Sequence, residues 1–369
     1  MALFRASKTI NLSTGHIYAY LYHRASQSSS LPTLLFLHGF PSSAYDFRYQ
    51  VDYFAPKGYG VLVPDLLGYG GTSQPIDVQK YSMTKMAREI VEILDHEGMS
   101  SVVGISHDWG SALLSTLLRQ HHQRFDAFVF MATYYGAAHP YSSDSVYDYG
   151  KLKAMAFEKF GFNAFGHTMF LGDSERAGKL LDDNIESFYD LVWAKDQELW
   201  KSYFRREGGI EEWVTKGKRG DVAAWVGDEE DERRKIIESW RMGNGFTPKC
   251  MWYKQLLDGV SVADEPGKSN STTKYLTSHE ARGLTEWMYA ADDSKEPLKI
   301  SQPILLMIEQ KDVKGRGEGA EQTAQEVSEQ VYVEKCDTYH FMMLEDSRGT
   351  NEKLERFFNQ QLGRSDGAH

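Results

Sequence analysis

The stretch VVGISHDWG, residues 102–110, decides how the rest of the sequence is interpreted. Apolar β-branched residues lead into a short polar kink, and the apolar run SALLSTLL follows at once, which predicts a strand, a sharp turn and a helix. A nucleophile elbow of this kind presents one side chain above a sheet and needs small residues two positions before and after it. Asp108 has Ser106 and Gly110 at those positions, whereas Ser106 would have Gly104 and an aspartate. The spacing therefore favours Asp108 over Ser106 as the nucleophile.

The composition is that of a globular protein. Of 369 residues, 41% are hydrophobic and 13% aromatic, which is enough for a large packed core. The formal net charge is −11 and no basic stripe is visible, so we expect neither nucleic acid nor a membrane surface as a partner. No secretory or membrane-spanning pattern is visible, so we expect a cytoplasmic protein. Cys250 and Cys336 are far apart in sequence, which disfavours a disulfide framework and a thiolate zinc site.

Both ends of the chain alternate between strand and helix patterns. Strand patterns occur in LPTLLFLHG, GYGVLVPD, VVGIS and DAFVFMATYY, and an amphipathic helix pattern occurs in SMTKMAREIVEILDHEGM. Further strand patterns follow late in QPILLMIEQKD and EQVYVEK, before a helix pattern in ERFFNQQL. This alternation predicts an α/β fold with a mostly parallel, doubly wound sheet.

Residues 136–299 have a different character. They are rich in aromatic and helix-forming residues, as in ESFYDLVWAKDQELWKSYF, and show no clear strand pattern. We therefore predict a core made of residues 1–135 and 300–369, with residues 136–299 inserted as an α-helical cap domain. Because doubly wound sheets bind ligands beyond the carboxyl ends of their strands, a cap there would enclose an apolar pocket.

Two polar residues follow the late strand patterns. Asp312 comes after PILLMIEQ, and His340 comes after YVEKCD. Asp108, Asp312 and His340 thus stand in the order nucleophile, acid, histidine, and each falls just past a strand, where an open α/β sheet forms its site. Three other acidic residues lie nearby in sequence as alternative partners of the histidine: Glu309, Asp337 and Glu345.

Two glycine-containing loops follow the earlier strand patterns. HGFP, residues 38–41, is either a tight Gly-Pro turn or a loop whose backbone N–H groups form an oxyanion hole. In the second interpretation, Phe40 and Trp109 are the N–H donors. DLLGYGGTS, residues 65–73, lacks both the GxGxxG pattern and the lysine of a P-loop, so a nucleotide site is disfavoured there.

Together these motifs resemble the epoxide hydrolase branch of the α/β-hydrolase family. HGFP, PDLLGYGGTS, SHDWG, the EQKD acid and the YHFMMLE histidine segment occur in the family order, although the family usually has glycine in place of Ser106. The resemblance implies that Asp108 is the nucleophile, His340 the water-activating base and Asp312 its acid partner.

The resemblance also implies two substrate-binding residues in the cap, because epoxide hydrolases of this type hold the epoxide oxygen with two cap tyrosines. MWYK, residues 251–254, matches one of their segments and makes Tyr253 a donor. FGHT, residues 165–168, resembles the other and places His167 where the family has tyrosine. His167 is therefore either a second donor or a packing residue. Phe40 and Trp109 complete the expected substrate-binding set.

The expected reaction follows from these residues. A carboxylate is ionised at neutral pH, so Asp108 can attack the epoxide carbon and form an ester without a base. His340 would then activate the water that cleaves this ester and releases a vicinal diol. No metal or organic cofactor is required. We expect a bulky apolar epoxide and water as small-molecule partners, and a homodimer is compatible with the sequence.

Three alternatives share part of the pattern. A haloalkane dehalogenase would use the same nucleophile, acid and histidine, but it usually has asparagine where Phe40 stands. A serine esterase would need Ser106 as nucleophile, against the spacing of the turn. A binding or ring-forming protein of secondary metabolism would keep the pocket without efficient hydrolysis, and the departure at His167 keeps this alternative open. Turnover of a simple aryl epoxide distinguishes the enzyme from the binding protein.

Overall fold

A sheet of eight strands organises the part of the chain that the structure describes. The structure is a computed structural model that describes residues 7–26, 30–135, 149–227, 229–263, 298–312, 317 and 319–363. The strands are β1 (Ser7–Asn11), β2 (Ile17–His23), β3 (Thr33–Leu37), β4 (Gly60–Pro64), β5 (Val102–His107), β6 (Phe125–Met131), β7 (Ile304–Glu309) and β8 (Val331–Cys336). Their spatial order is β1-β2-β4-β3-β5-β6-β7-β8. The pairs β1–β2 and β2–β4 are antiparallel and the other pairs are parallel, so the predicted α/β fold is confirmed.

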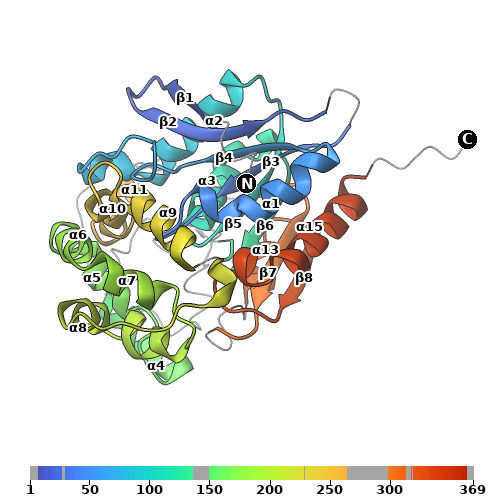
Figure 1. The fold of residues 1–369 in the computed structure, drawn as a ribbon. Coiled ribbons are helices and arrows are strands. Elements are labelled where there is room, and N and C mark those ends of the chain that lie inside the picture. The colour runs from blue at the N-terminus through green and yellow to red at the C-terminus, as the bar shows by residue number, and fades with distance from the viewer. Residues whose placement is uncertain are drawn as a thin grey trace, which may run out of the picture.

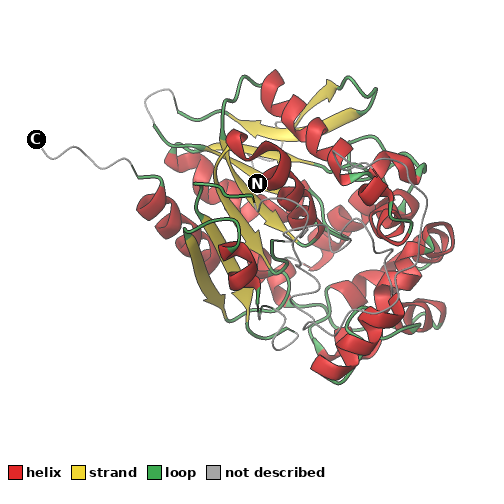
Figure 2. Ribbon diagram, turned by 180° about the vertical axis from the view of Figure 1, so that it is seen from behind, coloured by secondary structure: helices red, strands yellow, loops and turns green. Residues whose placement is uncertain are grey.

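Helices cover both faces of this sheet, as a doubly wound arrangement requires. α1 (Arg48–Phe54) packs against α15 (Ser347–Gln361) on the face in front in Figure 1, and α2 (Met83–His96) packs against α3 (Trp109–His121) behind it. Figure 2 shows the sheet between these helices from the opposite side. Shorter helices complete this part of the fold: η2 (Ala44–Phe47), η3 (Ala55–Lys57), η4 (Val78–Tyr81), η5 (His122–Arg124), α13 (Ala320–Gln325) and α14 (Met342–Glu345). None of the described helices is long and apolar enough to cross a membrane.

The central strands are buried along nearly their whole length and mostly apolar, because both of their faces are covered. Every residue of β4 and β5 is buried, and in β6 only Asp126 is partly exposed. A parallel sheet with helices on both faces produces such continuous apolar runs in place of alternation. These runs are the patterns that predicted the strands from the sequence.

The described helices between β6 and β7 gather beside the sheet, and we call them the helical insert. In Figure 1 they form the green-to-orange group to the left of and below the sheet. They are α4 (Tyr149–Phe160), α5 (Gly166–Gly172), α6 (Ser174–Asp183), α7 (Ile185–Val192), the π-helix η6 (Trp200–Phe204), α8 (Gly209–Thr215), η7 (Ala224–Val226), α9 (Glu229–Arg241), α10 (Phe246–Leu257) and α11 (Val260–Ala263). The predicted borders of the cap lie close to residues 136–148 and 264–297, which are outside the described residues.

Two buried tryptophans fasten the helical insert to the core. The indole N–H of Trp240 donates to the carbonyl oxygen of Pro41 at 2.6 Å, and that of Trp252 donates to the carbonyl oxygen of Leu67 at 2.9 Å. Pro41 follows β3 and Leu67 follows β4, so the insert rests on loops beyond the carboxyl ends of these strands. An indole N–H that is buried needs such a partner, and each bond fixes the position of one inserted helix.

Candidate active site

The turn between β5 and α3 raises Asp108 above the sheet, as the sequence predicts. Asp108 has φ 52° and ψ −122°, a backbone conformation that L-residues rarely adopt. The turn is tight because Gly110 lies against the backbone of Leu37, where a Cβ would collide with the carbonyl oxygen. Although Asp108 occupies the N-cap of α3, its side chain makes no capping hydrogen bond. The carboxylate is therefore directed to other partners.

Ser106, the rival nucleophile, lies below this turn. It is fully buried, and its hydroxyl donates to the carbonyl oxygen of Val129 at 3.1 Å and lies 3.0 Å from the hydroxyl of Ser111. Ser106 does not line the cavity described below. A serine esterase acting through this residue is therefore disfavoured.

His340 lies between the two aspartates that the sequence predicts. Its Nε2 is 3.6 Å from Oδ2 of Asp108, and its Nδ1 is 4.0 Å from Oδ2 of Asp312. These distances suit ion pairs and are longer than hydrogen bonds. The imidazole is held from below by His107, whose Nε2 lies 2.9 Å from the His340 carbonyl oxygen and whose ring centre lies 4.6 Å from the His340 ring. The arrangement places an imidazole between two carboxylates.

The turn that carries His340 is stabilised by Glu345. The Glu345 carboxylate accepts the backbone N–H groups of Tyr339 at 2.8 Å and of Phe341 at 3.1 Å. Burial raises the pKa of Glu345 to about 7, although these two hydrogen bonds act in the opposite direction. The other two acids considered from the sequence bind elsewhere: Glu309 to Tyr134, and Asp337 to Lys311.

The Asp108 carboxylate is held as an anion. Burial alone would raise its pKa, but the neighbouring imidazoles of His340 and His107 and the N–H of Phe40 hold the pKa of this carboxyl well below its usual range. The Phe40 N–H donates to Oδ1 of Asp108 at 2.9 Å, so one predicted oxyanion-hole donor already contacts the carboxylate. The second predicted donor, Trp109, begins α3 directly after Asp108, and its ring centre lies 5.1 Å from that of Tyr253.

His38 fixes the loop that carries Phe40, a role that the sequence analysis did not assign. The backbone N–H of Leu66 donates to Nε2 of His38 at 3.0 Å, so the ring proton is on Nδ1, which lies 3.0 Å from the carbonyl oxygen of Gly39. Burial lowers the pKa of His38, which favours this neutral form. The imidazole thus connects the loop after β3 to the loop after β4.

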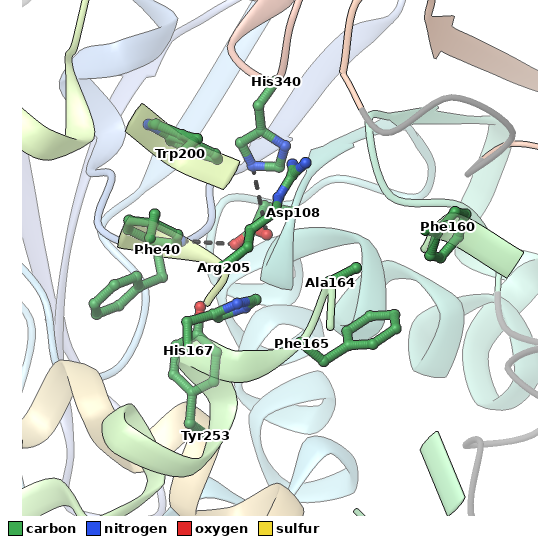
Figure 3. A pocket seen from close by; sticks show the side chains of 11 residues that line it. Phe40, Asp108, Phe160, Ala164, Phe165, His167, Trp200, Arg205, Tyr253 and His340 are labelled. Carbon is green, nitrogen blue, oxygen red and sulfur yellow. Dashed lines mark hydrogen bonds and ion pairs between the residues drawn. The ribbon is translucent and has the colours of Figure 1, made fainter. Parts of the chain in front are cut away.

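A cavity of about 70 Å³ lies above Asp108. Figure 3 shows Tyr253 and His167 across the cavity from His340, with Asp108 between them. The rings of Tyr253 and His167 stand edge to face with their centres 5.8 Å apart. The lining is largely aromatic: Phe40, Asp108, Phe160, Ala164, Phe165, His167, Trp200, Phe204, Arg205, Tyr253 and His340.

The structure thus brings five of the seven predicted site residues to one cavity. The other two do not line the cavity: Asp312 lies beside His340, and Trp109 directly follows Asp108 at the start of α3. Arg205 was not predicted: it lines the cavity and forms a buried ion pair with Asp312. No local motif surrounds Arg205, which is the first of two adjacent arginines in the helical insert. Among the described residues, no cluster of three or more His, Cys, Asp or Glu side chains is arranged to hold a metal ion.

The eight-stranded sheet, the elbow at Asp108 and the histidine after the last strand define the class of this protein. The family described as alpha/beta hydrolase fold matches residues 32–347, and the chain belongs to this family.

Curated relatives narrow the similarity to epoxide hydrolases. The chain is 39% identical over 83 residues to Epoxide hydrolase A of Mycobacterium tuberculosis, which is 22% of this chain and 26% of that protein. It is 33% identical over 118 residues to Epoxide hydrolase 2 of Siraitia grosvenorii, which is 32% of this chain and 37% of that protein. The aligned stretches therefore span much less than two thirds of these relatives. They confirm that the chain resembles epoxide hydrolases in sequence.

A solved structure supports the fold over nearly the whole chain. Epoxide Hydrolase A from Mycobacterium thermoresistibile matches with a TM-score of 0.69 at 18% sequence identity, covering 96% of this chain and 98% of that chain. At this sequence identity the match supports the fold alone.

Proposed function

We propose that this protein hydrolyses an epoxide to a vicinal diol through an ester on Asp108. The observation that carries the proposal is the position of an ionised carboxylate between a base and two donors. His340 lies 3.6 Å from Asp108, while Tyr253 and His167 face it across the cavity. The names of the curated relatives support the hydrolysis of an epoxide in general.

Ring opening is the first step. Oδ2 of Asp108 attacks a carbon of the epoxide, a C–O bond of the ring breaks, and the ring oxygen leaves as an alkoxide that stays attached to the substrate. We assign Tyr253 to protonate or hydrogen-bond this oxygen, with His167 beside it as the second donor. We assign Oδ1 to become the carbonyl oxygen of the ester, because it already accepts the Phe40 N–H.

Ester hydrolysis is the second step. Neutral His340 removes a proton from a water molecule, which attacks the carbonyl carbon of the Asp108 ester. The oxyanion forms on Oδ1 against the N–H groups of Phe40 and Trp109, and each such donor typically contributes about 3 kcal/mol. Asp312 stabilises the protonated His340. Collapse of the intermediate breaks the bond between the carbonyl carbon and the ester oxygen, and His340 gives its proton to this leaving oxygen of the diol. The second proton of the water restores the donor that protonated the ring oxygen, so that Asp108 is again a carboxylate.

We assign the helical insert to a cap domain that spans residues 136–299 and selects the substrate. The aromatic lining of the cavity favours a bulky apolar epoxide. A haloalkane dehalogenase would need side-chain donors for a halide, and the side chain of Phe40 offers none. The proposal needs no metal or organic cofactor, since proton transfers and a carboxylate nucleophile suffice.

Oxygen labelling tests the proposal. In a single turnover of an aryl epoxide in ¹⁸O-water, the label should enter the Asp108 carboxylate, and the first diol should be unlabelled, because its new oxygen comes from the aspartate. Label in the first diol with unlabelled Asp108 would mean direct attack by water. Absence of any turnover over a panel of epoxides would favour the binding or ring-forming alternative.

A further inference from the structure

Arg205 is an unexpected cation in the wall of an aromatic cavity. It lies directly after η6 in the helical insert, its side chain is only 7% exposed, and it lines the cavity above Asp108. Its guanidinium forms an ion pair with Oδ1 of Asp312, the acid that follows β7 in the core. We infer that Arg205 is a positioning residue for ester hydrolysis, which holds Asp312 so that a cap arginine and a core histidine share one carboxylate. The inference rests on the proposed function.

The two oxygens of Asp312 have different partners. Arg205 binds Oδ1, and Oδ2 lies 4.0 Å from Nδ1 of His340. Because a carboxylate is planar, fixing one oxygen with a rigid guanidinium limits where the other can lie. The Asp312 side chain is 6% exposed, so without the arginine its charge would be buried with less compensation. Arg205 thus determines the position of the carboxylate that supports His340.

Arg205 is itself held on a packed framework. Its backbone N–H donates to the carbonyl oxygen of Trp200 at 2.7 Å, and its guanidinium carbon lies 5.5 Å from the centre of a Trp200 ring. The indole N–H of Trp200 is bound by the carbonyl oxygens of Leu191 and Val192 in turn, at 3.1 and 3.0 Å. Trp200 also lies 5.4 Å from the His340 ring, so one buried indole packs beside both partners of Asp312.

The charged groups around His340 determine how removal of Arg205 would affect the protonation of its imidazole. The groups that face it are His107 and Asp108 from the β5–α3 turn, Asp312 after β7, Glu345 of α14 and, through Asp312, Arg205. In the ester intermediate Asp108 is neutral, while Arg205 keeps its positive charge at every relevant pH. A nearby cation favours the neutral form of an imidazole. Loss of Arg205 would therefore weaken the preference of His340 for its neutral, water-activating form in the ester intermediate.

Three variants of the full-length protein test the inference: Arg205→Met, Arg205→Lys and, as a matched control, Arg206→Met. Arg206 is the next residue, but its side chain is 48% exposed and it pairs with Glu212 at the surface. Rapid-quench mass spectrometry with styrene oxide would give the rates of ester formation and decay over pH 5 to 9, each for folded protein verified by circular dichroism.

In Arg205→Met, ester decay should slow about tenfold or more, and by a larger factor than ester formation. The rise of the decay rate with pH should shift by about one pH unit to higher pH. Arg205→Lys should keep the wild-type position of this rise, because it keeps the charge, and Arg206→Met should match the wild type in both rates.

Equal slowing of both steps with an unchanged pH profile would overturn the inference and leave Arg205 with a packing role. If Arg205→Met does not fold, Arg205→Lys provides the test. Because this variant retains the cation, a shift in the pH dependence of its ester decay would also overturn the inference. The two proposals fail differently. If the wild type forms no ester, the proposed function is wrong and the inference fails with it. If the wild type forms and cleaves the ester, and Arg205→Met does so at the same rates, only the inference is wrong.

Discussion

The backbone N–H of Phe40 donates to Oδ1 of Asp108 at 2.9 Å, while Oδ2 of the same carboxylate lies toward His340 at 3.6 Å. The two oxygens are therefore distinguished by their surroundings before any ester forms. A donor that is already in place need not reorganise when negative charge develops, and this is the main advantage of a preformed oxyanion hole. The assignment of one oxygen to the carbonyl and the other to the new bond follows from this pair of contacts.

Asp108→Asn should abolish diol formation, to below about a thousandth of the wild-type rate, because an amide of nearly the same shape is a poor nucleophile. The thermal melting curve should show a folded protein. Full first-turnover activity in this variant, with mass spectrometry excluding deamidation back to aspartate, would refute the assignment of the nucleophile.

His340→Gln should block only the second step, because ester formation needs no base. Incubation with an epoxide that the wild type turns over should increase the mass of the protein by that of the epoxide, and peptide mapping should place the adduct on Asp108. If turnover stops and no adduct accumulates, the division into two steps is wrong.

Tyr253→Phe should slow ring opening by about a hundredfold, because the leaving oxygen loses a proton donor while the aromatic packing is retained. Tyr253 is only 5% exposed and its ring packs edge to face on Phe40 with centres 5.1 Å apart, so the shape of the cavity should be preserved. The rate of ester formation in single-turnover experiments measures the effect. Tyr45→Phe, at a tyrosine outside the cavity lining, provides the control.

His167 should make ring opening depend on pH. A histidine is a charged, stronger donor only below about pH 6.5, whereas a tyrosine remains a donor up to about pH 10. In a His340→Gln background, ester formation should therefore fall as the pH rises through the titration of His167. The same rate in His167→Tyr should be flat over this range and higher at pH 8. A His167→Phe variant with the rate and pH profile of its parent would show that His167 only packs, leaving Tyr253 as the sole donor.

The sheet and the elbow could be predicted from the sequence because both are determined by local patterns. Strands buried on both faces produce continuous apolar runs, and the small residues on either side of Asp108 reveal which side chain the turn presents. The N-terminal hairpin of β1 and β2 was not predicted. In IYAYLYH of β2, tyrosines alternate with mostly aliphatic residues, and the pairing of β2 with β4 is a long-range contact that no neighbouring sequence motif indicates.

The roles of Arg205 and His38 could not be predicted for a related reason. Each acts on a residue from a distant part of the chain: Arg205 on Asp312, and His38 on the backbone of Leu66. Such contacts exist only once the helical insert and the loops have packed, and neither residue type nor spacing indicates them. The sequence left Glu309, Asp337 and Glu345 open beside Asp312, which the family resemblance preferred, and the contacts in the structure favour the same choice.

The positive φ of Asp108 also has an evolutionary consequence. Glycine occupies such a backbone region without penalty, whereas strain of this kind costs about 1–3 kcal/mol at a residue that carries a side chain. Selection for a stable fold alone would therefore drive position 108 away from aspartate, and only selection for the reaction would retain it. A descendant of this lineage that kept the pocket but no longer turned over substrate would be expected to carry glycine there.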